Sequence, residues 1–348
     1  MRLERRTSTT ARLVLLNIAL VLGLMAAAGS VLIAQAGAPV GPSWMAMLNG
    51  AFGSKLAITE TLTRATPLIF TGLACAIAFR SRLWNIGAEG QLYAGALAVA
   101  ALGSGVIQAP GYVLIPLVML AAALAGAAML MGPALLKRYM NVDDVVTTLL
   151  LNFIMALFVS IMVQGPMRDP MSMGWPQSLP VLDEATLDKL VTQSRLHTGL
   201  LLALALSVVL ALVESRSVFG LQRRAVGLNP EAARFAGIPA TRVLVWTTVV
   251  SGGLAGLAGA VEVMGMRGYV TGDLSPGFGY TGVIVAMLAQ LHPLGVPVAA
   301  LLVASVFVGA DAMSRMFNVP SFIADVMVSL SLLSMLAGSF FLSYRIRR

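Results

Sequence analysis

Apolar runs about as long as a lipid bilayer is thick recur along the whole chain. A helix needs about 20 mostly apolar residues to cross the hydrocarbon core. Only 11% of the 348 residues are charged, whereas a soluble domain carries about 25%. We therefore expect an all-α polytopic membrane protein, a single domain over residues 1–348 with about ten transmembrane helices. These spans run at about 13–36, 56–79, 83–105, 112–135, 145–164, 197–214, 243–263, 279–292, 294–312 and 321–343.

The distribution of basic residues predicts how these spans are oriented. With the N-terminus in the cytoplasm, sixteen of the 23 Lys and Arg residues fall in cytoplasmic segments, the largest group in a loop at 215–242. This agrees with the positive-inside rule. An even number of spans then places the C-terminus in the cytoplasm as well. The same rule explains the net charge of +8 without a nucleic-acid partner.

The longest polar and basic break between two apolar runs is Val218–Val243. Inside it, Asn229 suits an N-cap, Pro230 suits the first helical position, and Gly237 suits the C-terminal end. These signals predict a two-turn helix at Asn229–Ala236. Because so short a helix is marginal in water, it needs another surface to pack on, and we interpret that surface as another protein.

Two polar interruptions occupy corresponding places in the two halves of the chain. Leu83–Gly90 leads into the third predicted span, and Gly272–Gly282 leads into the short eighth span. Paired Gly/Pro interruptions are typical of transporters with pseudo-symmetric halves and broken helices near the pathway. The small residues of Ser251–Gly259 predict a close approach between helices.

Polar side chains at membrane depth are candidates for function because each is costly there. Asn85, Glu89 and Gln91 cluster at the start of the third span, and Asn152 lies deep in the fifth. The first three either line the substrate pathway or form a satisfied polar cluster that fixes a re-entrant turn. Asn152 either recognises a neutral polar substrate or bridges two helices. A pathway lined with such groups suits a neutral, hydroxyl-rich substrate.

Other polar features are expected near the outer side. Glu262, Asp311 and Asp325 are placed at outer span ends, where water reaches them. A long external loop at 165–196 is either a surface that meets a delivered substrate or docking protein, or a cover over the helix ends.

The sequence lacks the motifs of several functional classes. It has no Walker-type lysine motif, so we expect no nucleotide hydrolysis by this chain. No nucleophile–base pair supports an intramembrane enzyme. His197 and His292 are far apart in sequence, so we predict no catalytic residue, metal site or bound cofactor. A self-sufficient secondary transporter is an alternative, although no central carboxylate cluster suits a proton relay.

Three segments resemble a known family. Phe219–Ile238 (FGLQRRAVGLNPEAARFAGI) resembles the cytoplasmic coupling loop of ABC importer permeases of the branched-chain amino acid and simple-sugar superfamily. Trp84–Gln91 (WNIGAEGQ) resembles the NIG-x-EGQ signature of its nucleoside-type members. Asn141–Asn152 resembles their NEV-to-LN segment, with Asp143 where Glu is usual. The similarity extends over about residues 56–343.

The resemblance implies a permease subunit of a nucleoside importer in a bacterial plasma (inner) membrane, with a simple-sugar (ribose-type) permease as the alternative. It also implies a separate ABC ATPase subunit that uses ATP and Mg, a second related permease forming a heterodimer, and an extracytoplasmic substrate-binding lipoprotein. In such a complex, closing of the ATPase dimer pushes a coupling helix and the broken spans re-orient. The implied coupling residues are Gly227, Asn229, Pro230, Glu231, Ala232, Ala233, Gly237 and Ile238.

Overall fold

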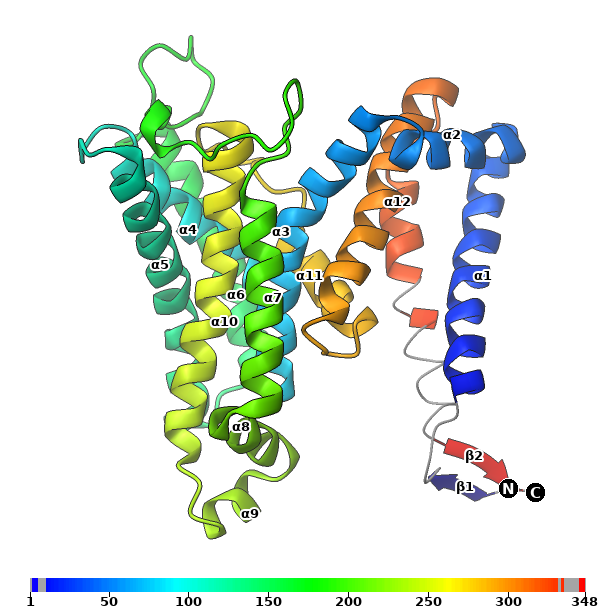
Figure 1. Ribbon diagram of the computed structural model, residues 1–348, viewed down its shortest axis with the longest axis vertical. Helices are drawn as coiled ribbons and strands as arrows, with labels where there is room; N and C mark the ends of the chain where they lie inside the picture. The colour runs from blue at the N-terminus through cyan, green and yellow to red at the C-terminus, as the bar shows by residue number, and fades with distance from the viewer. Residues whose placement is uncertain (1, 6–10, 331–332, 335–343, 348) are drawn as a thin grey trace. The chain divides into compact units, whose positions relative to one another are not determined.

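The fold is built from helices (Figure 1). A computed structural model describes residues 2–5, 11–330, 333–334 and 344–347. Two four-residue strands, β1 (Arg2–Arg5) and β2 (Tyr344–Arg347), form an antiparallel pair near the chain ends. The helices confirm the all-α class. They are α1 (Ala11–Gln35), α2 (Val40–Phe52), α3 (Lys55–Arg80), α4 (Ala88–Gly103), α5 (Gly111–Met140), α6 (Asp144–Gln164), α7 (Gly199–Arg216), α8 (Val218–Leu228), α9 (Pro230–Phe235), α10 (Ala240–Glu262), α11 (Phe278–Leu288) and α12 (Gly295–Phe317), with a 3₁₀ turn η1 (Asp183–Ala185) and a π-helical turn η2 (Val263–Arg267).

Nine of the ten predicted spans coincide with a helix, but the count of ten spans is not confirmed. Six helices in the described part of the chain are long and apolar enough to cross a membrane. A seventh crossing results if α1 and α2, which meet at a bend of 117°, are one broken span. With 16 and 11 residues, α4 and α11 are shorter than a bilayer crossing requires. The tenth predicted span, 321–343, lies partly outside the described residues.

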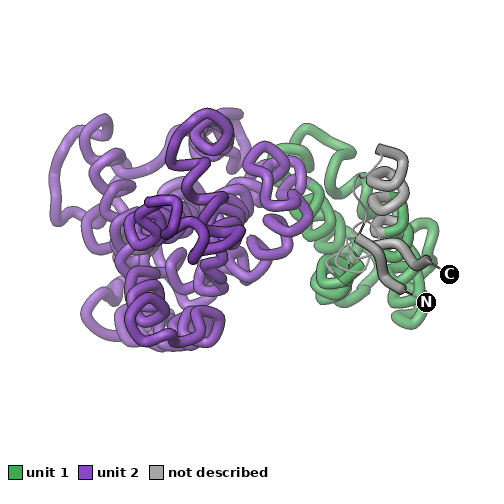
Figure 2. The backbone as a smooth tube through the Cα atoms, turned by 90° about the horizontal axis from the view of Figure 1, so that it is seen from below, with its two compact units in different colours: residues 1–61, 302–348 green, residues 62–301 purple. Residues whose placement is uncertain are grey.

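The chain divides into two compact units, coloured separately in Figure 2. Met1–Thr61 and Leu302–Arg348 form the first unit, and Leu62–Leu301 form the second. Inside the first unit, the Trp44 ring nitrogen on α2 donates to the Ser30 hydroxyl on α1 at 3.0 Å. The sequence did not predict α2, which occupies an assumed loop. That the whole chain acts as a single domain stays a prediction.

In the second unit, α10 packs closely against both α4 and α5. A Cβ atom added at Gly256 would lie 2.2 Å from the Ala122 carbonyl oxygen on α5, and one at Gly259 would lie 2.0 Å from the Leu92 carbonyl oxygen on α4. Gly95 on α4 approaches the Gly256 backbone in the same way. These contacts confirm the close approach predicted from the small residues of Ser251–Gly259.

The loop at 165–196 covers the ends of the helices opposite α8 and α9 (Figure 1). Its backbone donates hydrogen bonds from Val181 to Gly268, from Leu182 to Gly103 and from Leu187 to Met264, at 2.8–2.9 Å. Of the two alternatives predicted for this loop, the structure shows the cover over the helix ends. Docking of another protein on this loop stays a prediction.

The glycine packing of α10 predicts a contrast between two substitutions on one helix. Gly259→Ala should lower the thermal unfolding midpoint in detergent, because overpacking costs about 1–3 kcal/mol and the added methyl meets backbone. Gly253→Ala is the matched control, since its added Cβ would lie 3.5 Å from the nearest atom. An equal midpoint for the two variants would contradict this account of the helix packing.

Candidate functional site

The predicted helix in the basic loop is present as α9, and both of its ends are closed as the sequence indicates. The Asn229 side-chain oxygen accepts hydrogen bonds from the backbone N–H groups of Glu231 at 3.0 Å and Ala232 at 3.1 Å. At the other end Gly237 is left-handed, with φ +77°. The Ile238 N–H then reaches the Ala233 carbonyl oxygen at 2.9 Å, which is the pattern of a Schellman motif.

The surface that holds α9 belongs to the same chain, which corrects the interpretation that another protein supplies it. Ala233 is buried with Val226 of α8 and Val243 of α10, and Ile238 packs against this cluster. Local burial thus compensates for the short length of α9. Its opposite face is open, because Phe235 is 96% exposed.

The helix before it, α8, was not predicted from the sequence. Its N-cap is Ser217, whose hydroxyl accepts a hydrogen bond from the Gly220 N–H at 3.1 Å. Its C-terminal part lies against the end of α3, because a Cβ atom at Gly227 would lie 2.1 Å from the Arg80 carbonyl oxygen. Movement of α8 is therefore linked sterically to the end of α3.

A buried ion cluster makes a second link between α8 and α3. One Glu214 carboxylate oxygen, at the end of α7, lies 2.8 Å from an Arg223 guanidinium nitrogen and 2.6 Å from an Arg80 nitrogen. Burial lowers the pKa of Arg223, while neighbouring Glu214 opposes that shift. Arg223 also donates to the Ile77 carbonyl oxygen of α3. No local sequence signal pairs Glu214 with Arg223, since they meet only when α8 folds back on α7.

Asn85 and Gln91, predicted together, form a closed pair between the turn after α3 and the first turn of α4. The Asn85 amide donates to Gln91 at 2.9 Å, and the Gln91 amide donates to Asn85 at 2.7 Å. Asn85 also donates to the Ser251 hydroxyl, which donates to the Ala74 carbonyl oxygen. Both amides are fully buried. They join the turn to α10 and α3.

Asn152 of α6 holds the same turn from its other side. Its amide donates to the Ile86 carbonyl oxygen at 2.9 Å, and its oxygen accepts from the Gly90 N–H at 2.9 Å. The structure thus brings Asn85, Gln91 and Asn152 together around one break in the helices. Of the predicted alternatives, the structure shows a satisfied polar cluster for Asn85 and Gln91 and a bridge between helices for Asn152. Contact of these residues with substrate stays a prediction.

Glu89 joins the two interrupted segments to each other. Its carboxylate accepts a hydrogen bond from the Gly279 N–H at 2.6 Å, at the start of α11. A few residues along α4, the Tyr93 hydroxyl donates to the Gly272 carbonyl oxygen at 2.8 Å and accepts from the Ser275 N–H at 3.1 Å. The segments predicted at Leu83–Gly90 and Gly272–Gly282 are therefore in direct contact within the second unit.

The prediction that water reaches Glu262 is wrong. Glu262 ends α10 and is 4% exposed. The reason is the loop at 165–196, which folds over this end of α10 and bonds to the neighbouring Met264. Asp325 is exposed and Asp311 is partly exposed, as expected of residues near span ends.

The family described as "Branched-chain amino acid transport system / permease component" matches residues 57–342. The chain belongs to this family. The match confirms the resemblance to the branched-chain amino acid and simple-sugar superfamily. As a permease of this kind, the chain is a multi-pass membrane protein and a transport subunit.

Three relatives of this permease are each 34% identical to it. The guanosine ABC transporter permease NupP of Bacillus subtilis aligns over 91% of this chain and 90% of its own length. The glucose ABC transporter permease TsgB13 of Haloferax volcanii aligns over 94% of this chain and 88% of its own length. The nucleoside ABC transporter permease NupB of Lactococcus lactis aligns over 76% and 75%. Second permeases of the first and third organisms, NupQ at 27% and NupC at 24% identity, each align over 71% of this chain and about 80% of their own.

The double hydrogen bond of Asn152 predicts a large effect of its removal on stability. Asn152→Ala leaves the Gly90 N–H and the Ile86 carbonyl oxygen unpaired, which costs about 1–3 kcal/mol per buried group. The unfolding midpoint of the purified permease should therefore fall. Thr147→Ala on the same helix is the control, because the Thr147 hydroxyl bonds only to carbonyl oxygens at the start of α6. A midpoint for Asn152→Ala equal to that of Thr147→Ala would refute the structural role.

Proposed function

We propose that this chain is the permease subunit of an ATP-driven importer for nucleosides. The observation that carries the proposal is α9: a capped two-turn helix, seated on α8 and α10 with its outer face open, in a chain of a permease family. Two of the three relatives are named for guanosine or nucleosides. The location we propose is a bacterial plasma (inner) membrane, with both termini and α9 in the cytoplasm.

A separate ABC ATPase subunit supplies the energy in this proposal. The sequence has no phosphate-binding lysine motif, so ATP and Mg are used by the partner and the permease binds no cofactor itself. The partner docks on the open face of α9. The coupling residues are Gly227, Asn229, Pro230, Glu231, Ala232, Ala233, Gly237 and Ile238, of which Ala233 faces inward and Glu231 outward.

The coupling has a physical route in the contacts of the second unit. Pushing α9 moves α8 through Val226, and α8 abuts α3 at Gly227 and through the Arg223–Glu214–Arg80 cluster. The end of α3 leads into the turn held by Asn85. Coupling of this kind requires that the ATPase bind one permease conformation more tightly than the other.

Two further partners belong to the proposal. Bacillus subtilis and Lactococcus lactis each have two different permeases, NupP with NupQ and NupB with NupC, that match this chain, which supports a heterodimer here. A substrate-binding lipoprotein docks on the loop at 165–196. The tip of that loop presents Met171, Met173 and Trp175, which are 86%, 102% and 65% exposed.

The second candidate cargo is a simple sugar. A glucose permease matches this chain at the same identity as the two nucleoside-type permeases and covers more of this chain's length. Both cargoes are neutral and rich in hydroxyl groups, so the buried amides do not separate them. The signature WNIGAEGQ favours the nucleoside.

Reversing one charge on the open face of α9 tests the coupling role. Glu231→Arg should abolish uptake and weaken ATPase co-purification, while membrane insertion stays normal, because an exposed charge near a helix N-terminus is worth only about 0.3–1 kcal/mol. Glu184→Arg, also exposed but on the loop at 165–196, is the matched control and should retain ATPase co-purification. Normal uptake by Glu231→Arg would remove the coupling role of α9.

Cargo and energy source are tested in liposomes that hold the permease pair, the ATPase and the binding protein. We expect uptake of labelled nucleoside to require ATP and to be blocked by excess unlabelled nucleoside but not by ribose or glucose. Competition by either sugar would favour the sugar permease. Uptake driven by an ion gradient without the ATPase would establish a secondary transporter instead.

A further inference from the structure

A groove lies beside α9 on the same end of the second unit. Its volume is about 590 Å³. One wall is the turn Ser81–Trp84 after α3, another is the junction between α5 and α6, and the third is formed by α9 and the start of α10. The groove is therefore bordered both by the helix proposed to receive the ATPase and by the turn that leads to Asn85.

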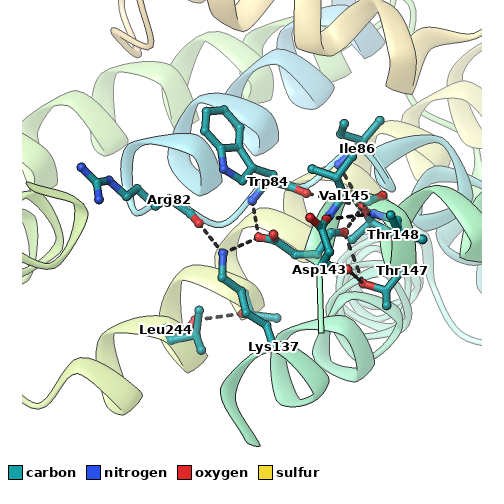
Figure 3. A network of polar contacts seen from close by, with 12 residues as sticks. Arg82, Trp84, Ile86, Lys137, Asp143, Val145, Thr147, Thr148 and Leu244 are labelled. Carbon is teal, nitrogen blue, oxygen red and sulfur yellow. Dashed lines mark hydrogen bonds and ion pairs between the residues drawn. The ribbon is translucent and has the colours of Figure 1, made fainter. Parts of the chain in front are cut away.

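Part of the charge in this groove is neutralised internally. The Lys137 ammonium group lies 2.6 Å from the Asp144 carboxylate and also donates to the Arg82 carbonyl oxygen. The same carboxylate oxygen accepts the Trp84 N–H at 2.6 Å. These contacts join the wall after α3 to the wall between α5 and α6 (Figure 3). The exposed Asp143 carboxylate caps α6 through the Val145 and Val146 N–H groups.

Two arginines in the groove have no such partner. The guanidinium groups of Arg82 and Arg234 are exposed and make no hydrogen bond or ion pair within the described ranges 2–5, 11–330, 333–334 and 344–347. In Figure 3 the Arg82 side chain extends away from its backbone contact with Lys137. By contrast, Arg138 donates to the Thr241 hydroxyl at 3.0 Å. Within the described residues, the groove thus carries two guanidinium groups without a partner, one on the wall after α3 and one on α9.

The backbone at Arg82 adds a reason to regard its side chain as functional. Arg82 closes α3 in the left-handed region, with φ +56°, where glycine is the favoured residue. Residues with a Cβ atom in this region are strained, and such strain clusters at functional sites. An arginine is therefore held where glycine would fit better, with its charged group at the groove.

We propose that this groove accepts an acidic side chain of the ATPase subunit, paired with Arg82 and Arg234. The inference rests on the proposed docking of the ATPase on α9. Because Pro230 and Arg234 of α9 form part of one wall, a protein that docks on α9 comes next to the groove. Guanidinium groups bind carboxylates through paired hydrogen bonds. The contact reaches the Arg82 turn directly, which gives the ATPase a second point of force beside α9.

The observations favour a protein carboxylate over an anionic lipid headgroup. The exposed Asp143 carboxylate also lines the groove, and it would repel a surface densely covered with phosphate. A single acidic side chain brings one negative charge to the groove, whereas a membrane surface brings many. Binding of lipid instead is a defined outcome of the test.

The test measures the affinity of the purified ATPase for the assembled permease pair in nanodiscs of neutral lipid. Arg82→Glu and Arg234→Glu should each weaken binding about tenfold or more and reduce its salt dependence. Arg82→Gly should weaken binding without lowering the unfolding midpoint, because glycine suits the left-handed backbone. Arg242→Glu is the matched control: it is exposed nearby, lies outside the groove, and should change affinity less than about twofold.

The outcomes separate this inference from the proposed function. If the wild-type pair does not bind the ATPase, the proposed function fails. If the wild-type pair binds and the Arg82→Glu, Arg234→Glu double variant binds equally well, only the groove inference is overturned. If the double variant loses binding of phosphatidylglycerol in mixed-lipid nanodiscs while its ATPase affinity is unchanged, the groove is a lipid site and the inference is also overturned. Restored binding of Arg82→Glu by a single Asp or Glu→Arg change on the ATPase would identify the paired residue.

Discussion

The structure depends on keeping a break in the helices satisfied where the surroundings are apolar. Backbone N–H and C=O groups that leave a helix inside such surroundings need partners from the protein. Between α3 and α4 these partners are side chains: Asn85 from the turn itself, and Asn152 and Asp144 from α6. The turn is thereby tied to several helices at once, and none of them can shift without disturbing its hydrogen bonds.

The second break is the segment before α11. It is bonded to the first break, so we expect the two to move together. Glu89 caps the start of α11, and Tyr93 holds the segment before it. On the other side, α8 meets the end of α3 through Gly227 and the Glu214 ion cluster. A continuous series of packed contacts therefore runs from α9 to both breaks. Such continuity makes transmission possible, whereas energetic coupling has to be measured.

What the sequence predicts well is what local chemistry determines. The bounds of α9 follow from Asn229 and Gly237, which act on neighbouring backbone, and nine helices lie where apolar length predicts a span. The missed features depend on distant residues. Burial of Glu262 requires the loop at 165–196 to fold over it, and α8 is stabilised by an ion cluster that exists only after folding. The sequence could place Asn85, Gln91 and Asn152 near a break, but it could not reveal their partners, which include Ser251 on a distant helix and backbone groups.

These partners also bear on how cargo could pass. In the observed conformation the amides of Asn85, Gln91 and Asn152 are bonded to the protein, so a substrate could use them only after those bonds open. Leaving a buried group unpaired costs about 1–3 kcal/mol, so opening two to four of them costs several kcal/mol. Moving a two-state equilibrium from 1:99 to 99:1 requires about 5.5 kcal/mol. A partner that opened these bonds would therefore have to bind the other state more tightly by a free energy of this order.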